Sequence, residues 1–193
     1  MKKVLVFLLT FPLLLTGCGQ AKEVGKDLQG QYVKVATAEM EAEVTSHMTT
    51  EDRTYTLRCT YDAHNGAATE ILAPEELKGI SATIGIDGLK VAYNGTAVSS
   101  GELQTLCPAN CLPWLMEALA HGYLQSEGEE TAEGVPCYRL VLENAAMDGS
   151  KILCSAWLDQ ETLIPRYAEF TTGDQVTISL VMQSFSCTTE EGE

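Results

Sequence analysis

ATAEMEAEVT, residues 36–45, is the stretch that decides the fold of this chain. Small or apolar side chains alternate with threonine and glutamate along its whole length. A period of two is typical of a β-strand with one buried face and one face in water. Residues 54–61 alternate in the same way after the polar segment 49–52, so the two stretches are predicted to pair as an antiparallel hairpin.

Further strands follow on both sides of the middle of the chain. Turn dipeptides such as Asn65-Gly66 and Asn94-Gly95 separate short stretches rich in apolar and β-branched residues. Strands are predicted over 68–73, 80–86, 89–93, 135–143, 151–158, 166–170 and 176–185. With the first two, this makes about nine antiparallel strands.

Helical spacing replaces alternation in the middle of the chain. Leucine, methionine and tyrosine side chains recur three or four residues apart, which predicts a helix over 111–125 that ends around Gly122. Asn110 is the expected N-cap and Pro113 suits the first turn. Residues 127–133 are expected to form a polar loop, and 21–34 an amphipathic N-terminal helix.

The predicted fold class is therefore mainly β with α. Strands with one polar face indicate a sheet that is covered on one side only. We expect a curved antiparallel sheet, forming a half-barrel, with one or two helices on its concave face.

Three stretches resemble steps of the LolA/LolB-like family of outer-membrane lipoprotein-sorting proteins. They are ILAPEELKGI (71–80), IGIDG (84–88) with VAYNG (91–95), and AWLDQETLIP (156–165). The resemblance spans most of residues 30–186 in order and implies an N-terminal helix, a long curved antiparallel sheet and helices that fill its concave face. It also implies a lipid or lipoprotein cargo.

The first eighteen residues have the build of a secretory signal. Lys2 and Lys3 precede the apolar run 4–15, which is too short to span a membrane. The ending Leu15-Thr16-Gly17-Cys18 resembles the lipobox of bacterial lipoproteins, which implies lipidation of Cys18 and cleavage just before it. The chain is then expected at the extracytoplasmic face of a membrane, with a signal peptide 1–17, a lipidated tether 18–26, a LolA/LolB-like domain 27–187 and an acidic tail 188–193.

Charge limits the partners of the mature chain. Removal of residues 1–17, with two lysines, takes the formal net charge from −15 to −17. Such an acidic surface repels phosphate backbones and anionic headgroups, so nucleic acid is not expected as a partner and the membrane is expected to be reached through the anchor alone. A monomer is expected.

Six cysteines remain after Cys18. An even number in an exported chain permits three disulfides, while buried free thiols are the alternative. Zinc is disfavoured because the Cys-Pro-Ala-Asn-Cys segment has three intervening residues and no histidine nearby. The candidate disulfide cysteines are Cys59, Cys107, Cys111, Cys137, Cys154 and Cys187.

Signals of catalysis are weak along the chain. The three histidines, His47, His64 and His121, fall in no motif of a nucleophile or metal site, and no glycine loop for phosphate is present. We expect no enzyme activity, no catalytic residue, no metal and no cofactor.

The function expected instead is binding of an apolar ligand. An open sheet with an inserted helix leaves an apolar cleft that suits a lipid or a lipoprotein acyl group. The alternative is a protein-interaction or envelope-sensing module whose cavity is filled by its own side chains. The candidate ligand-binding residues are Met40, Val44, Tyr55, Leu57, Trp114, Met116, Tyr123 and Trp157.

Overall fold

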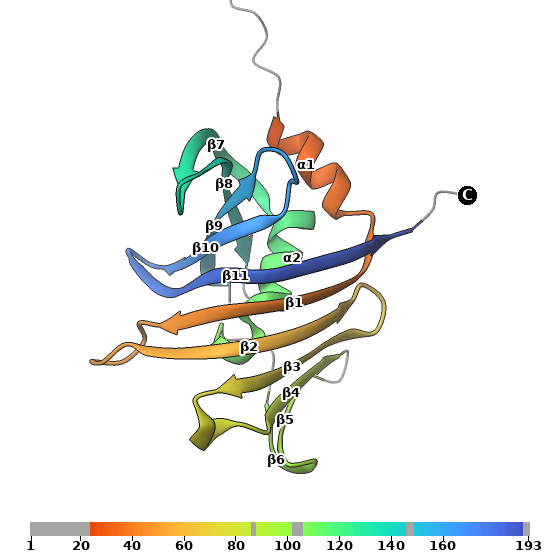
Figure 1. The fold of residues 1–193 in the computed structure, drawn as a ribbon, viewed down its shortest axis with the longest axis vertical. Helices are drawn as coiled ribbons and strands as arrows, with labels where there is room; N and C mark the ends of the chain where they lie inside the picture. Colours follow the sequence, from red (N-terminus) through yellow and green to blue (C-terminus); the bar gives the residue numbers. More distant parts are fainter. Residues whose placement is uncertain (1–23, 86–87, 102–105, 146–148, 191–193) are drawn as a thin grey trace, which may run out of the picture.

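The computed structural model describes residues 24–85, 88–101, 106–145 and 149–190 (Figure 1). The signal, Cys18 and the first part of the expected tether lie outside these ranges. The helices are α1 (Val24–Tyr32) and α2 (Cys111–His121), with 3-10 turns at Glu75–Leu77 and Pro108–Asn110. The strands are β1 (Val35–Ser46), β2 (Arg53–Asp62), β3 (Gly66–Ala73), β4 (Ile80–Gly85), β5 (Gly88–Tyr93), β6 (Thr96–Gly101), β7 (Tyr123–Ala132), β8 (Val135–Ala145), β9 (Lys151–Asp159), β10 (Pro165–Thr172) and β11 (Gln175–Thr189).

The eleven strands of the described ranges belong to one antiparallel sheet with the order β6-β5-β4-β3-β2-β1-β11-β10-β9-β8-β7. The long strands β1 and β11 pair at its centre, and β6 and β7 are its two edges. The sheet curves around α2 without closing (Figure 1). The predicted curved antiparallel sheet is confirmed. The predicted term half-barrel is only a loose description of this open sheet.

The alternation in residues 36–45 has its expected effect. Ala38, Met40, Ala42 and Val44 are at most 2% exposed and face the core, while Glu39 and Glu43 point to solvent. Helix α2 packs against this inner face through a second apolar set. Its fully buried side chains include Leu112, Leu115, Met116 and Leu119.

Two strands were not predicted from the sequence. Residues 127–133, expected as a polar loop, lie mostly within β7, whose residues are nearly all exposed because it is an edge strand. Without a buried face, such a strand has no apolar alternation to detect. The other is β6, which also forms an edge.

Helix α2 ends at His121, next to the end predicted around Gly122, so residues 122–125 of the predicted range are not helical. Gly122 is extended, with φ −60° and ψ 144°, and a Cβ on it would lie 2.6 Å from the Ala118 carbonyl oxygen. Glycine therefore permits the direct change from α2 into β7. Asn110 is the N-cap residue, but its side chain accepts a hydrogen bond from the Cys107 N–H at 2.8 Å instead of capping α2.

The predicted N-terminal helix is present as α1 and includes the last three residues of the expected tether. Leu28 and Tyr32 are buried, and the Gln29 side-chain amide donates to the Gly122 carbonyl at 2.7 Å. Helix α1 thus docks on the junction between α2 and β7. No helix within the described ranges is long and apolar enough to cross a membrane.

Candidate functional site

An open cleft of about 520 Å³ lies beside α2, on the concave side of the sheet. Its size falls within the ~300–1,000 Å³ of typical small-molecule sites. The β2–β3 hairpin, β4, the exposed side of α2 and the end of β8 enclose it. The lining residues are Tyr61, Asp62, Ala63, Gly66, Ala67, Ile84, Asn110, Pro113, Trp114, Glu117, Asn144 and Ala145.

Helix α2 supplies one wall through Pro113, Trp114 and Glu117. Glu117 follows Pro113 by four residues and Trp114 by three, so the three side chains share one side of the helix. Trp114 is only partly buried and packs against the edge of the core, whereas Leu115 and Met116 are buried in it. The same helix therefore fills the upper concave face and leaves a wall for the cleft.

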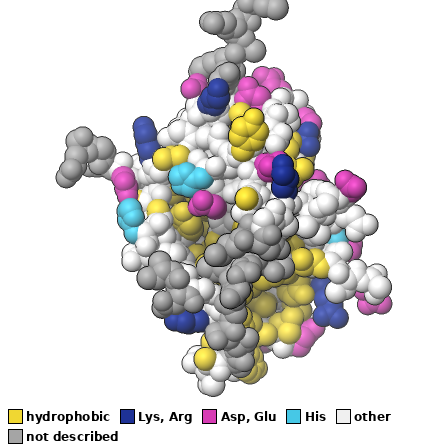
Figure 2. All heavy atoms as spheres, turned by 180° about the vertical axis from the view of Figure 1, so that it is seen from behind, with side chains coloured by type: hydrophobic (Ala, Val, Ile, Leu, Met, Phe, Trp, Pro, Cys, Tyr) yellow, Lys and Arg dark blue, Asp and Glu magenta, His cyan; other side chains and the backbone are white. Residues whose placement is uncertain are grey.

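The floor of the cleft is apolar. Ala67 on β3 pairs with Ile84 on β4, and Ile84 pairs with Leu89 on β5, so the three side chains share the inner face. Ile71 and Leu89 are only partly buried, and Tyr93 is 46% exposed. Figure 2 shows hydrophobic side chains gathered over this lower part of the sheet.

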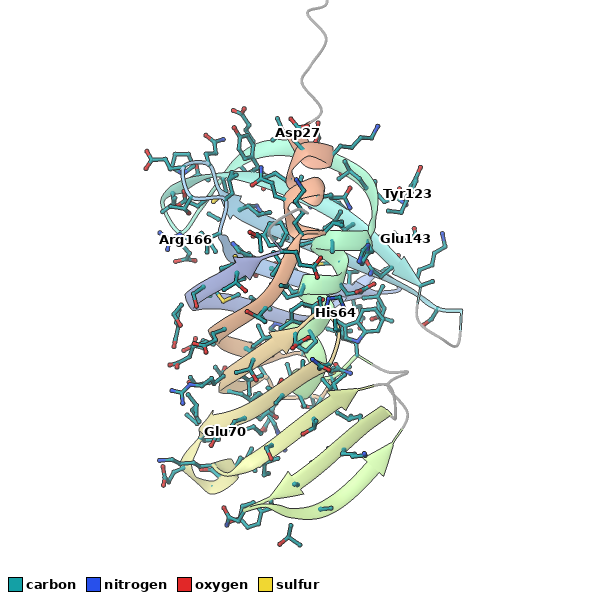
Figure 3. The ribbon with its side chains drawn as sticks, turned by 90° about the vertical axis from the view of Figure 1, so that its right-hand side faces the viewer. Asp27, His64, Glu70, Tyr123, Glu143 and Arg166 are labelled. Carbon is teal, nitrogen blue, oxygen red and sulfur yellow. The ribbon has the colours of Figure 1, made fainter. Side chains whose placement is uncertain are left out.

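Carboxylates mark the polar side of the cleft. Asp62 accepts hydrogen bonds from the Asn65 side chain at 2.9 Å and from the backbone N–H groups of His64 and Asn65 at 2.8 and 2.9 Å. These bonds, that of the Asn65 side chain foremost, lower the pKa of Asp62. Burial, followed by the charges of Glu117 and Asp62, raises the pKa of Tyr61. Figure 3 shows the neighbouring His64 beside the lower end of α2.

Of the predicted ligand-binding residues, the structure places Trp114 in the cleft wall. Met40, Val44, Leu57 and Met116 are at most 1% exposed and belong to the core packing between sheet and helix. Tyr55 is partly buried against the same core. Apolar periodicity identifies an inner face but does not separate the part that α2 covers from the part left open.

Trp157 lies on the opposite face of the sheet from the cleft. Its neighbours Ala156 and Leu158 are fully buried in the core, and adjacent side chains of a strand point to opposite faces. The indole N–H donates to Glu130 at 2.8 Å, and the Arg139 guanidinium lies 5.1 Å from the ring centroid. This tryptophan therefore contacts Glu130 and Arg139 on the outer face of the sheet.

Tyr123 also lies away from the cleft. It is the first residue of β7 and is 70% exposed. Figure 3 shows it projecting from the outer edge of the sheet. Tyr123 follows Leu119 at helical spacing, but α2 ends two residues before it, at His121.

The cysteines after Cys18 are free thiols in the structure, which shows none of the disulfides that their even number predicts. Cys59, Cys111, Cys137 and Cys154 are buried, Cys107 is partly buried and Cys187 is exposed. Burial raises the pKa of Cys59 to about 11 and that of Cys154 further. These two are inert core residues at neutral pH.

No group of three or more metal-ligating side chains suited to a metal ion occurs among the described residues. His47 lies 2.9 Å from Asp52, and His64 lies 2.7 Å from Glu190. Both histidines form surface pairs with carboxylates.

Several cleft residues were not predicted, namely Ala67, Ile84, Glu117 and Asn144. Ile84 could have been found from its alternating strand. Glu117 carries a usable signal as well, since it is an isolated charge one turn from Trp114 in an otherwise apolar helix. Asn144 carries none, because only the curvature of the sheet brings the end of β8 towards the β2–β3 hairpin.

No protein-family model matches the chain. No curated protein matches it in sequence either. Among solved structures, an uncharacterized conserved protein from Thermus thermophilus has a TM-score of 0.51 at 13% identity, covering 89% of this chain and 90% of its own. The two proteins share a fold.

Two further solved structures are similar at lower scores. A DUF1329 family protein from Desulfovibrio piger has a TM-score of 0.47 at 15% identity, covering 88% of this chain and 93% of its own. A putative outer membrane lipoprotein-sorting protein domain from Vibrio parahaemolyticus has a TM-score of 0.45 at 12% identity, covering 88% and 92%.

Proposed function

We propose that this chain is a lipoprotein, anchored through Cys18 on the extracytoplasmic face of a membrane, that binds an apolar ligand without covalent chemistry. The ligand is a lipid or the acyl group of a lipoprotein, and it occupies the cleft between α2 and the β2–β4 part of the sheet. The lipobox-like ending Leu15-Thr16-Gly17-Cys18 supports the anchor.

The observation that carries the ligand proposal is the incomplete cover of the concave face. Helix α2 buries its leucines over the centre of the sheet, but Ile71, Leu89 and Tyr93 retain exposure on the inner face of β3–β5. Apolar surface next to an open cleft gains free energy when an apolar ligand removes it from water, at about 25 cal/mol per Å². An acyl chain is a ligand of this kind.

The test uses the mature chain with Cys18→Ser, so that the protein is recovered without its own anchor. Native mass spectrometry after gentle purification, followed by solvent extraction, is expected to find one lipid or acyl species per chain. A clean apo mass that persists after incubation with membrane lipids would contradict ligand binding and favour a protein-interaction module with a self-filled cavity.

A pair of matched variants locates the ligand. Ala63 is exposed and lines the cleft, so Ala63→Trp is expected to narrow the cleft and abolish the added mass without disturbing the core. Ala68 is exposed on the other face of the sheet, and Ala68→Trp is expected to retain the lipid. Equal retention by both variants would place the ligand elsewhere.

A further inference from the structure

The charged residues that line the cleft have a single sign. Asp62 and Glu117 line it, and the described lining residues include no lysine, arginine or histidine. His64 lies next to this lining and is paired with Glu190 at 2.7 Å. An anionic headgroup would therefore approach two carboxylates without a compensating cation. The cost of this approach grows as the headgroup leaves water.

The charge of Asp62 is built into the β2–β3 turn. Three hydrogen bonds from His64 and Asn65 hold its carboxylate, and each favours the ionised form. The folded hairpin therefore lowers the pKa of the carboxyl and favours its negative form. Its charge is therefore a fixed property of the cleft, although its oxygens are occupied within the turn.

Glu117 is the second carboxylate that lines the cleft. It is exposed between the buried residues Met116 and Ala118, one helical turn from Trp114. Within the described part of the chain, no basic side chain forms an ion pair with it, in contrast to Glu41, which pairs with Arg58 at 3.2 Å. Its carboxylate is therefore available to a ligand.

Two aromatic rings complete the polar side of the cleft. Tyr61 and Trp114 both line it, and the face of an aromatic ring attracts a cation. The Asn144 side-chain oxygen is buried next to Gly122 and is closed to a ligand. The two rings therefore favour a positively charged ligand over an anion.

We infer that the cleft selects amphiphiles that carry a cationic nitrogen next to an apolar chain, and that Glu117 is the residue that sets this preference. The inference rests on the proposed function, because the apolar part of the ligand occupies the same cleft. It adds the chemical class of the polar end.

The test is isothermal titration calorimetry of the mature Cys18→Ser chain with decyltrimethylammonium, decyl maltoside and decyl sulfate. The three probes have the same ten-carbon alkyl chain, and their headgroups are cationic, neutral and anionic, respectively. Titrations below micelle formation at ~0.15 M salt limit the effect of the overall negative charge. We expect the cationic probe to bind at least tenfold more tightly than decyl sulfate, with the maltoside between them.

Matched variants separate the cleft from the general charge of the protein. Glu117→Gln is expected to weaken binding of the cationic probe about threefold to fivefold, the effect of one partly exposed charge pair, and to affect the maltoside less. Glu43→Gln removes the same charge from the outer face and is expected to change neither affinity.

The outcomes distinguish the two proposals. Equal binding of all three probes, or equal losses in Glu117→Gln and Glu43→Gln, would overturn the charge preference and leave the apolar site standing. Failure of all three probes to bind would overturn the apolar site, and the charge preference with it.

Discussion

The Tyr32 hydroxyl at the end of α1 donates a hydrogen bond to the Leu163 carbonyl oxygen, 2.8 Å away in the turn between β9 and β10. The two residues are 131 positions apart. Tyr32 is 7% exposed, and its burial, with a smaller effect of Cys187, raises the pKa of the phenol. Leu163 has a positive φ of 61°, and its N–H donates to the Asp159 carbonyl at 2.8 Å. The bond therefore joins the first helix to a tight turn of the distant half-sheet.

Tyr32→Phe removes this hydrogen bond and keeps the ring. We expect a loss of about 1 kcal/mol in the free energy of unfolding, because the partly buried Leu163 carbonyl loses its donor. Urea denaturation followed by circular dichroism measures the change. Tyr123→Phe, at a 70% exposed site, is the control and is expected to be neutral. Similar values for both variants would mean that α1 does not depend on the turn.

Asp159 makes stability depend on pH. Its carboxylate accepts hydrogen bonds from the Thr162 and Glu161 N–H groups at 3.0 and 2.9 Å, and these bonds lower its pKa. A carboxyl whose pKa is lower in the folded state stabilises the fold above its unfolded pKa of about 4, and this stabilisation is lost as the pH falls through the folded value.

The check is the urea midpoint of the wild type and of Asp159→Asn between pH 7 and pH 3. The wild type is expected to be the more stable at pH 7, and the difference is expected to shrink towards pH 3. Asp174→Asn, on an exposed turn, is the control for loss of a negative charge. A difference that stays constant with pH would show that the Asp159 charge has no part in the stability.

The sequence predicts the central elements of this fold because each has one buried face. Residues 36–45 and the leucines of α2 show their periods clearly, since the sheet and the helix cover each other. Edge strand β7 has no buried face and cannot be detected this way. The cleft was only partly predictable, because residues such as Asn144 reach it through the curvature of the sheet. Met40 and Leu57 have the same apolar pattern as a ligand site but lie under α2.

Thiol reactivity is expected to follow burial. In the native Cys18→Ser chain, iodoacetamide is expected to modify the exposed Cys187 first and Cys107 more slowly. The four buried cysteines are expected to react only after unfolding, because burial raises their pKa values and blocks access.

Mass spectrometry after alkylation counts the modified thiols. Unfolding without a reducing agent is expected to expose six reactive thiols, one for each free cysteine of the structure. Fewer than six without reductant, restored to six with it, would reveal disulfides and contradict the free-thiol state.

The anchor makes a prediction of its own. A bacterial host grown with an alkyne-tagged fatty acid is expected to label the full chain, and Cys18→Ser is expected to remove the label and release the protein from the membrane fraction. Cys187→Ser, which removes an exposed thiol, is the control and is expected to retain both. Label that persists in Cys18→Ser would contradict lipidation at this residue.

Mutations on the two sides of α2 are expected to separate the stability of the core from ligand binding in the cleft. Met116 is 1% exposed and lies on the side of α2 that faces the core. Met116→Ala is therefore expected to cost about 2–5 kcal/mol of stability and to leave the cleft wall in place. Trp114 is partly buried and lines the cleft, so Trp114→Leu is expected to cost less stability but to weaken binding of decyl maltoside. Urea denaturation and calorimetry of both variants, below their unfolding midpoints, measure the two effects independently. If Met116→Ala weakened binding as much as Trp114→Leu while remaining folded, the ligand would lie beneath α2, and the helix would act as a lid that moves to admit it.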